Sequence, residues 1–204
     1  MAERNLIHLK GHKLCVIDVE TTGLDPSINE IIQICILPLN SDFEPSKEVP
    51  PFYAIIKPEN QDAINPKAMQ INQMNLFEIC KNGIDTWFAQ ELLDEWFEKL
   101  NLGYGKKIAP LAMNWPFDRS FIQAWLGNSA YEDFFHYHYR DTMVAAHFLN
   151  DVAAFNSEEF PFPKQSLKYL CSQLGIENKF AHDAMQDCLA TAKVWKRMVK
   201  MAIV

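Results

Sequence analysis

The feature that most restricts the fold is a series of three strand-like runs in the first 57 residues. Apolar and β-branched residues fill Lys13–Val19, Glu30–Leu39 and Phe52–Lys57, and turn-forming residues separate these runs. The first turn, Thr22–Pro26, has the sequence TGLDP. Connections of this kind join neighbouring antiparallel strands. We therefore expect an antiparallel three-stranded meander.

The remainder of the chain alternates between helical and strand-like patterns. Asp85 can cap a helix through about Leu100, and its apolar residues recur every four positions, which is typical of one buried face: Phe88, Leu92, Trp96 and Leu100. Further on we expect a buried strand at Ile108–Met113, a helix from about Trp115, a short strand at Tyr137–Asp141, and helices at Thr142–Asn150, Gln165–Leu174 and Asp183–Met201. Strands followed by alternating strands and helices predict an α/β fold with a mixed five-stranded sheet flanked by helices.

The chain has no internal repeat and no low-complexity linker, and its 204 residues suit one domain. We therefore expect a single domain over 1–204, with its core at about 13–200. Residues 151–163 (DVAAFNSEEFPFP) are expected to form an irregular loop or lid. Its aromatic residues Phe155, Phe160 and Phe162 could contact a ligand, or could equally pack onto the body of the protein.

Charge and cysteine content exclude several classes of protein. Nineteen Lys and Arg against 26 Asp and Glu give a net charge of −7, which argues against a basic surface that coats nucleic acid. The five cysteines are scattered without C-x-x-C spacing, so we expect neither disulfides nor a cysteine zinc site. Without a signal-like or membrane-spanning apolar stretch, we expect a cytoplasmic protein with no membrane association.

Two acidic residues end the first strand. Asp18 and Glu20 are two positions apart, so both should lie on one face of the strand. Adjacent carboxylates repel each other, and partial burial adds a desolvation penalty. A divalent cation such as Mg²⁺ removes both penalties. The alternative is a pair of exposed charges at the end of a strand.

Further acidic residues occur on predicted helices, on or beside their apolar faces. Asp118 lies three and four positions before Phe121 and Ile122, so it shares their face, although it could simply complement the helix dipole. Asp187 falls at the edge of the buried stripe of the last helix. His182 lies on a turn just before that helix, where a histidine is otherwise a capping or surface residue.

Four carboxylates from three elements, together with one histidine, are the groups needed for two-metal hydrolysis of a phosphodiester bond. Two ions can polarise the phosphate and stabilise the leaving oxygen. A histidine can accept the proton of the attacking water near neutral pH.

These residues stand in three recognisable motifs. The first is DVETTGL over Asp18–Leu24, the second is NWPFDRSF over Asn114–Phe121, and the third is HDAMQD over His182–Asp187. In order and approximate spacing they resemble the DEDD-type 3′–5′ exonucleases of the ribonuclease-H-like fold. Because its last motif contains a histidine, the chain resembles the DEDDh variant of this family, which includes polymerase proofreading exonuclease domains.

The resemblance implies a role for each matching residue. Asp18, Glu20 and Asp187 would ligate metal directly, Asp118 would act on a second ion through water, and His182 would be the general base. The cofactor would be two Mg²⁺ ions, with Mn²⁺ as a substitute, and the products nucleoside 5′-monophosphates. The implied substrate-binding residues are Thr21, Thr22, Leu24, Asn114, Phe117 and Phe121. By the same resemblance, the backbone around Glu20–Thr22 would hold the terminal 3′-hydroxyl, and Leu24 and Phe117 would contact the last bases. For Leu24 and Phe117, core packing is the alternative.

The expected partner is the 3′ end of DNA or RNA, in single-stranded form, and the sequence does not distinguish the two sugars. A non-catalytic nucleic-acid-binding module and a proofreading subunit with a polymerase partner are the alternatives. One face of the last helix is basic, through Lys193, Lys196, Arg197 and Lys200. We interpret this face as solvated surface, with a phosphate track as the alternative.

Overall fold

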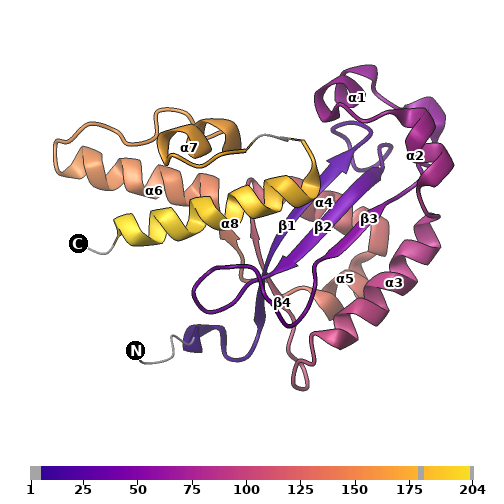
Figure 1. Cartoon of the computed structure of the whole chain (residues 1–204), viewed down its shortest axis with the longest axis horizontal. Coiled ribbons are helices and arrows are strands. Elements are labelled where there is room, and N and C mark those ends of the chain that lie inside the picture. Colours follow the sequence, from indigo (N-terminus) through magenta and orange to yellow (C-terminus); the bar gives the residue numbers. More distant parts are fainter. Residues whose placement is uncertain (1–5, 179–181, 203–204) are drawn as a thin grey trace.

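The computed structural model describes residues 6–178 and 182–202. Within them the strands form one five-stranded sheet in the order β3-β2-β1-β4-β5 (Figure 1). The strands are β1 (Lys13–Thr21), β2 (Ile31–Pro38), β3 (Phe52–Ile55), β4 (Ile108–Ala112) and β5 (Arg140–Asp141). β1, β2 and β3 pair antiparallel, whereas β4 pairs parallel with β1 and with β5. The mixed sheet and the meander are confirmed.

The helices follow the predicted order, with three additions. They are α1 (Pro66–Asn72), α2 (Leu76–Asn82), α3 (Thr86–Lys99), α4 (Trp115–Leu126), α5 (Asn128–Phe134), α6 (Thr142–Phe155), α7 (Leu167–Gln173) and α8 (Ala184–Met201). Short 3-10 helices occupy Ile7–Leu9 and Gln61–Ala63. The sequence did not predict α1, α2 and α5 as separate elements, because helices of seven residues show little periodicity.

The two faces of β1 pack against different helices. Cys15, Ile17 and Val19 face a core shared with α3, α4 and α5, while Leu14 and Val16 face α8. In Figure 1, α8 crosses one face of β1 and β2, and α6 and α7 lie beyond it. A third apolar cluster joins α6 and α7 to α8. By alternation, Asp18 and Glu20 follow Val16 onto the α8 side of the sheet.

The predicted buried stripe of α3 is confirmed at Trp96 and at Leu100, which follows the helix, but not at Phe88. Ala89, Leu93 and Trp96 are buried, whereas Phe88 is 39% exposed beside the exposed Trp87. Phe88 is therefore not a core residue as expected. In the first half of the helix the neighbouring residues Ala89 and Leu93 are buried instead. Trp96 anchors the second half, because it packs on Phe52 and donates its indole N–H to the Pro50 carbonyl.

The predicted irregular loop begins later than expected. α6 continues to Phe155, so residues 151–155 are helical, because DVAAF extends the preceding helix without a breaker. Phe162 is 1% exposed, and the Asn150 side chain bonds both its N–H and its carbonyl. Phe155 and Phe160 are 90% and 57% exposed. The irregular segment therefore starts at Asn156, and burial of Phe162 and its bonds to Asn150 hold it against the body of the protein.

Two further expectations concern cysteines and membranes. All five cysteines are free thiols, as predicted. Among the described residues, no helix has the length and apolar character needed to span a bilayer.

Candidate active site

Asp18 and Glu20 lie where β1 extends past its parallel neighbour. Pairing of β1 with β4 reaches only to Val16 and Leu111. Beyond that point a side chain takes over, since the Val19 N–H donates to Asp118 Oδ1 at 3.0 Å. Asp118 is 3% exposed in the first turn of α4. The hydrogen bond places the carboxylate of α4 directly beside the two carboxylates of β1.

The start of α4 is held by Asp141, a residue for which the sequence predicted no individual role. Its buried carboxylate accepts hydrogen bonds from the N–H groups of Asn114 and Trp115 at 3.2 and 2.8 Å, and from that of Met143 at 2.8 Å. Asp141 therefore caps α6 and fixes the entry of α4 together. An acidic residue directly before a helix was the available signal.

Asp187 and His182 come from the start of α8. Asp187 is 7% exposed, and its carboxylate accepts from Asn178 Nδ2 at 2.8 Å and from the His182 N–H at 3.0 Å. His182 has a φ of +70°, in the left-handed region that non-glycine residues seldom adopt. The hydrogen bond to Asp187 holds this backbone turn, so the carboxylate and the imidazole are positioned together.

The five predicted residues converge on one place. Ligand atoms of Glu20, His182 and Asp187 all lie within 4.8 Å of one another. Asp18 lies close enough to Asp118, Glu20 and Asp187 for each of them to raise the pKa of its carboxyl. His182 is the exposed member, whereas Glu20, Asp118 and Asp187 are buried.

The electrostatics of this cluster are unfavourable without a cation. Burial, followed by repulsion from Asp187 and Asp183, raises the pKa of Glu20 to about 8. Burial is also the largest cause that raises the pKa values of Asp18 and Asp118 well above the usual range. In the described part of the chain, no Lys or Arg forms an ion pair with these carboxylates. Closely spaced oxygen donors without a counter-charge fit a divalent metal ion.

The β1–β2 loop beside the cluster is tightly anchored. A Cβ on Gly23 would lie 2.3 Å from Asn29 Oδ1, so only glycine fits there. Asn29 in turn accepts from the Asp25 N–H at 3.0 Å and donates to the Ala63 carbonyl at 2.7 Å. The loop presents Leu24 to solvent at 80% exposure. Core packing, the alternative considered for Leu24, is wrong.

The other predicted substrate-binding residues differ in their exposure to solvent. Asn114 is exposed at the end of β4, and Phe117 is half-buried with its ring centroid 5.0 Å from that of Phe121. Phe121 is 1% exposed, so the expectation that it contacts substrate is wrong: its side chain fills the core beneath the site.

Thr21 and Thr22 also form hydrogen bonds within the protein. Thr21 Oγ1 donates to the Gly23 carbonyl at 2.6 Å. The Thr22 hydroxyl accepts from the Glu30 N–H, and its own N–H and carbonyl bond Glu30 and Asn65. Both side chains are buried and hold the loop through these bonds.

Sequence reasoning also missed the role of Gln33. Its Oε1 accepts from the Ala184 N–H at 2.7 Å, and its Nε2 donates to the Tyr53 hydroxyl at 2.6 Å. Gln33 thereby ties the start of α8 to the sheet. It also lines a cavity of about 610 Å³ that contains His182 and extends to Lys168 and Ser172 of α7.

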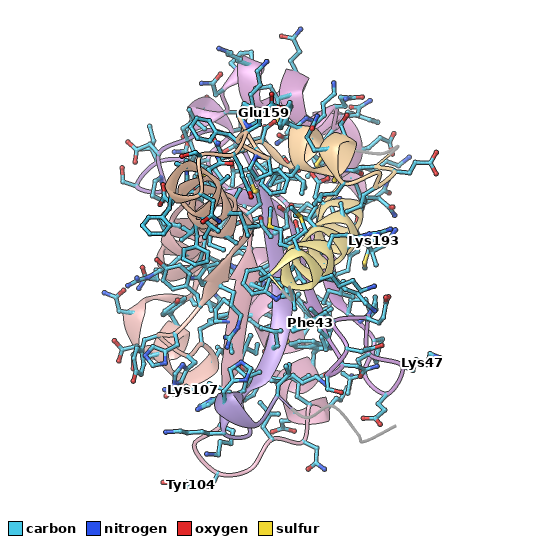
Figure 2. All side chains as sticks on the ribbon, turned by 90° about the vertical axis from the view of Figure 1, so that its left-hand side faces the viewer. Phe43, Lys47, Tyr104, Lys107, Glu159 and Lys193 are labelled. Carbon is cyan, nitrogen blue, oxygen red and sulfur yellow. The ribbon has the colours of Figure 1, made fainter. Side chains whose placement is uncertain are left out.

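The basic face of α8 is partly neutralised. Lys196 lies 2.6 Å from Glu44 and 3.8 Å from Asp42, whereas Lys193, Arg197 and Lys200 are exposed. Figure 2 shows Lys193 on the outer side of α8.

Comparison with known proteins agrees with this arrangement. The sequence pattern of the exonuclease family, RNase_T, matches residues 15–195, which include all five residues of the cluster. The chain belongs to the exonuclease family. Among solved structures, an Escherichia coli exonuclease I in complex with a dT13 oligonucleotide has a TM-score of 0.69 at 21% identity, over 94% of this chain and 43% of the other. Cell-death related nuclease 4 has a TM-score of 0.69 at 19% identity, over 93% and 64%.

The chain is also similar in sequence to two kinds of curated protein. It is 28% identical to the PolC-type DNA polymerase III of Thermotoga maritima over 91% of this chain, but that match spans only 12% of the polymerase. It is 26% identical to the ribonuclease T of Buchnera aphidicola, over 90% of this chain and 81% of the relative.

Proposed function

We propose that this protein is a metal-dependent 3′–5′ exonuclease of the DEDDh type, which hydrolyses the terminal phosphodiester bond of DNA or RNA and releases nucleoside 5′-monophosphates. The observation that carries the proposal is the convergence of Asp18, Glu20, Asp118, Asp187 and His182 at the end of β1. Membership of the exonuclease family and similarity to exonuclease I and ribonuclease T support it.

The donor set suits two Mg²⁺ ions, with Mn²⁺ as a substitute. Asp18, Glu20 and Asp187 would hold metal directly, and Asp118 would serve the second ion. Bound divalent ions supply positive charge for the scissile phosphate and for the leaving oxygen. Every donor here is a carboxylate oxygen, which magnesium prefers to nitrogen or sulfur.

The remaining chemistry belongs to the side chains themselves. His182 is the exposed member of the cluster, and one of its ring nitrogens lies within 4.8 Å of one carboxylate oxygen of Glu20 and one of Asp187. From that position the imidazole would accept the proton of the attacking water. The bond from the His182 N–H to Asp187 fixes the turn that carries the ring.

Substrate contacts would come from groups that are open to solvent beside the cluster. Leu24 at the loop tip and the half-buried Phe117 would contact the terminal bases, and Asn114 lies at the same end of the sheet. The substrate would be a single-stranded 3′ end, held at one pocket rather than along a basic surface, in keeping with the net charge of −7.

A 5′-labelled oligonucleotide tests the function. With Mg²⁺, the wild-type protein should shorten it stepwise from the 3′ end. EDTA, Asp18→Ala and His182→Ala should each abolish the ladder, while Asp151→Ala, an exposed acidic position on α6, should not. Binding without shortening would reject hydrolysis in favour of a non-catalytic nucleic-acid-binding module. Matched DNA and RNA strands identify the preferred sugar.

The similarity to a PolC-type polymerase favours one further candidate, a proofreading role within a polymerase complex. Size-exclusion chromatography of the protein with and without a replicative polymerase tests this candidate. Co-elution together with activity on mismatched primer ends would support it. Separate elution with full activity on free strands would support an independent enzyme. We further propose that the chain is one domain, with its core at about 13–200, and that it is cytoplasmic.

A further inference from the structure

A second cluster of polar side chains lies at the other end of the sheet, where β1, β4 and β5 begin. A cavity of about 340 Å³ opens there between His8, Lys10, His12, His136, His138 and Arg140. Four of the six histidines of the chain line it. Figure 2 places Lys107, whose backbone contacts His12, at the end of the molecule opposite Glu159. The catalytic cluster uses none of these residues.

The histidine rings form a contiguous aromatic surface. The centroids of His12 and His136 are 4.1 Å apart, and those of His136 and His138 are 5.1 Å apart. Tyr137 stacks on His136 with a centroid distance of 4.5 Å and an interplanar angle of 27°. Tyr137 is 77% exposed, so a flat ring face is offered to solvent at the mouth of the cavity.

Backbone hydrogen bonds fix the tautomers of the two inner histidines. His12 Nδ1 accepts from the Lys107 N–H at 3.0 Å, and His136 Nδ1 accepts from the His138 N–H at 3.1 Å. A ring nitrogen that accepts carries no proton, so the proton of each neutral ring must lie on Nε2. Both Nε2 atoms are therefore donors.

Two Nε2–H donors cannot ligate a metal ion, but they can donate hydrogen bonds to an anion. A metal ligand needs the free lone pair of Nε2, with Nδ1–H as a donor to a second group. In His12 and His136, by contrast, Nδ1 is the acceptor and Nε2 carries the proton. Among the described residues, no three ligand atoms in this cavity come within metal-binding range of one another.

The charges around the cavity point the same way. Arg140 is half-buried, Lys10 is exposed, and no carboxylate of the described chain lines the space. Burial, followed by repulsion from Lys106, Lys107 and His138, lowers the pKa of His12. Burial and the neighbouring histidines likewise lower the pKa of His136. The cavity thus gathers fixed cations and N–H donors with no anion to balance them.

We infer that this cavity binds the phosphate group of a nucleotide. Arg140, Lys10 and the Nε2 donors of His12 and His136 supply charge-assisted hydrogen bonds to phosphate oxygens. The exposed ring of Tyr137 supplies a stacking surface for the attached base. The inference goes beyond the proposed exonuclease function and does not depend on it, because it uses no residue of the catalytic cluster. The phosphate could belong to a free nucleotide or to a nucleic acid strand.

Histidine ring signals in NMR spectra of the ¹⁵N-labelled, metal-free protein test the inference. Inorganic phosphate, thymidine 5′-monophosphate and an oligothymidylate are titrated separately, each against sodium chloride at equal ionic strength. The His12 and His136 rings should shift in a saturable way, while the His182 ring in the catalytic cluster should not respond to inorganic phosphate. Arg140→Gln should weaken binding about tenfold, corresponding to one charge-assisted hydrogen bond.

Two controls keep the result interpretable. His147→Gln removes an exposed histidine outside the cavity and should leave binding unchanged. Lys10→Gln, at an exposed position, should weaken binding even if Arg140→Gln disturbs the short strand β5. Tighter binding of the oligothymidylate than of the mononucleotide would identify a strand phosphate, and equal binding a free nucleotide. Shifts no larger than those in chloride, or equal affinity in Lys10→Gln and His147→Gln, would overturn the inference.

Discussion

The backbone N–H of Val19 donates to the carboxylate of Asp118 at 3.0 Å, although the two residues are 99 positions apart in the chain. This bond replaces the strand pairing that β4 no longer supplies beyond Leu111. It also joins the second predicted motif to the first. One interaction therefore satisfies a buried donor and brings a third carboxylate to Asp18 and Glu20.

Asp118→Asn should separate the charge of this residue from its structural role. The amide oxygen can still accept from Val19, so the fold should keep its stability, while loss of the charge should lower exonuclease activity by about 100-fold or more. Asp118→Ala should also lower the free energy of unfolding, by about 1–3 kcal/mol, because the Val19 N–H is left unpaired. Urea denaturation and a labelled-strand assay measure the two effects. Full activity in Asp118→Asn would contradict a metal role.

Asp141→Ala should destabilise the protein without removing any group of the catalytic cluster. Its carboxylate accepts from the N–H groups of Asn114, Trp115 and Met143, and the substitution leaves them without this partner. We expect the free energy of unfolding to fall by about 2–4 kcal/mol. Asp151→Ala on the exposed surface of α6 is the matched control and should change it by less than about 0.5 kcal/mol. Equal effects of the two substitutions would reject the capping role of Asp141.

The stability of the metal-free protein should fall as the pH rises. In the native state Glu20 holds its proton up to a pKa of about 8, whereas the usual value is 4.5. The native state therefore binds more protons than the unfolded chain between these values, and stability is lost as the pH rises through that window. The raised pKa values of Asp18 and Asp118 act in the same direction. Melting temperatures between pH 5 and pH 8.5 measure the slope, which Glu20→Gln should flatten.

Magnesium should reverse this trend. Metal binding requires ionised carboxylates and so competes with protons, and it stabilises only the folded state. The increase in melting temperature on adding Mg²⁺ should be larger at pH 8 than at pH 5.5. An increase that is independent of pH, or that persists in an Asp18→Asn Glu20→Gln double variant, would show that the ion binds elsewhere.

Phe155, at the end of α6, and Phe162, in the segment after it, should respond to substitution in opposite ways. Phe162 is buried among residues of α6, α7 and α8, so Phe162→Ala should lower the free energy of unfolding by about 3–5 kcal/mol. Phe155 is 90% exposed, so Phe155→Ala should change it by less than about 0.5 kcal/mol. If the segment contacts the nucleic acid strand, Phe155→Ala should raise KM without changing kcat. Unchanged kinetics would reject a lid role for Phe155.

Local patterns in the sequence predicted a large part of the fold. Alternation along β1 placed Asp18 and Glu20 on one face, and helical spacing placed Asp118 with Phe121 and Ile122, because both periods act over a few residues. The same reasoning was wrong for Phe88 and for residues 151–155, since neighbouring rows of a helix can both be apolar and no local signal ended α6 at Asn150. Phe121 matched a motif but lies in the core, so matching a motif did not establish exposure.

The sequence by itself determined which residues could form the site. These are acidic side chains in apolar surroundings, at the C-terminal end of β1 and in the first turns of α4 and α8. Only the tertiary structure decided how they are held together. Val19 binds Asp118, Asp141 fixes the start of α4, and Gln33 ties the start of α8 to β2. These bonds join residues far apart in the chain, so their energies depend on which segments meet, and no local periodicity records that. For the same reason, no local pattern predicts the cavity lined by His8, His12, His136 and His138. It exists only because β1, β4 and β5 lie side by side in the sheet.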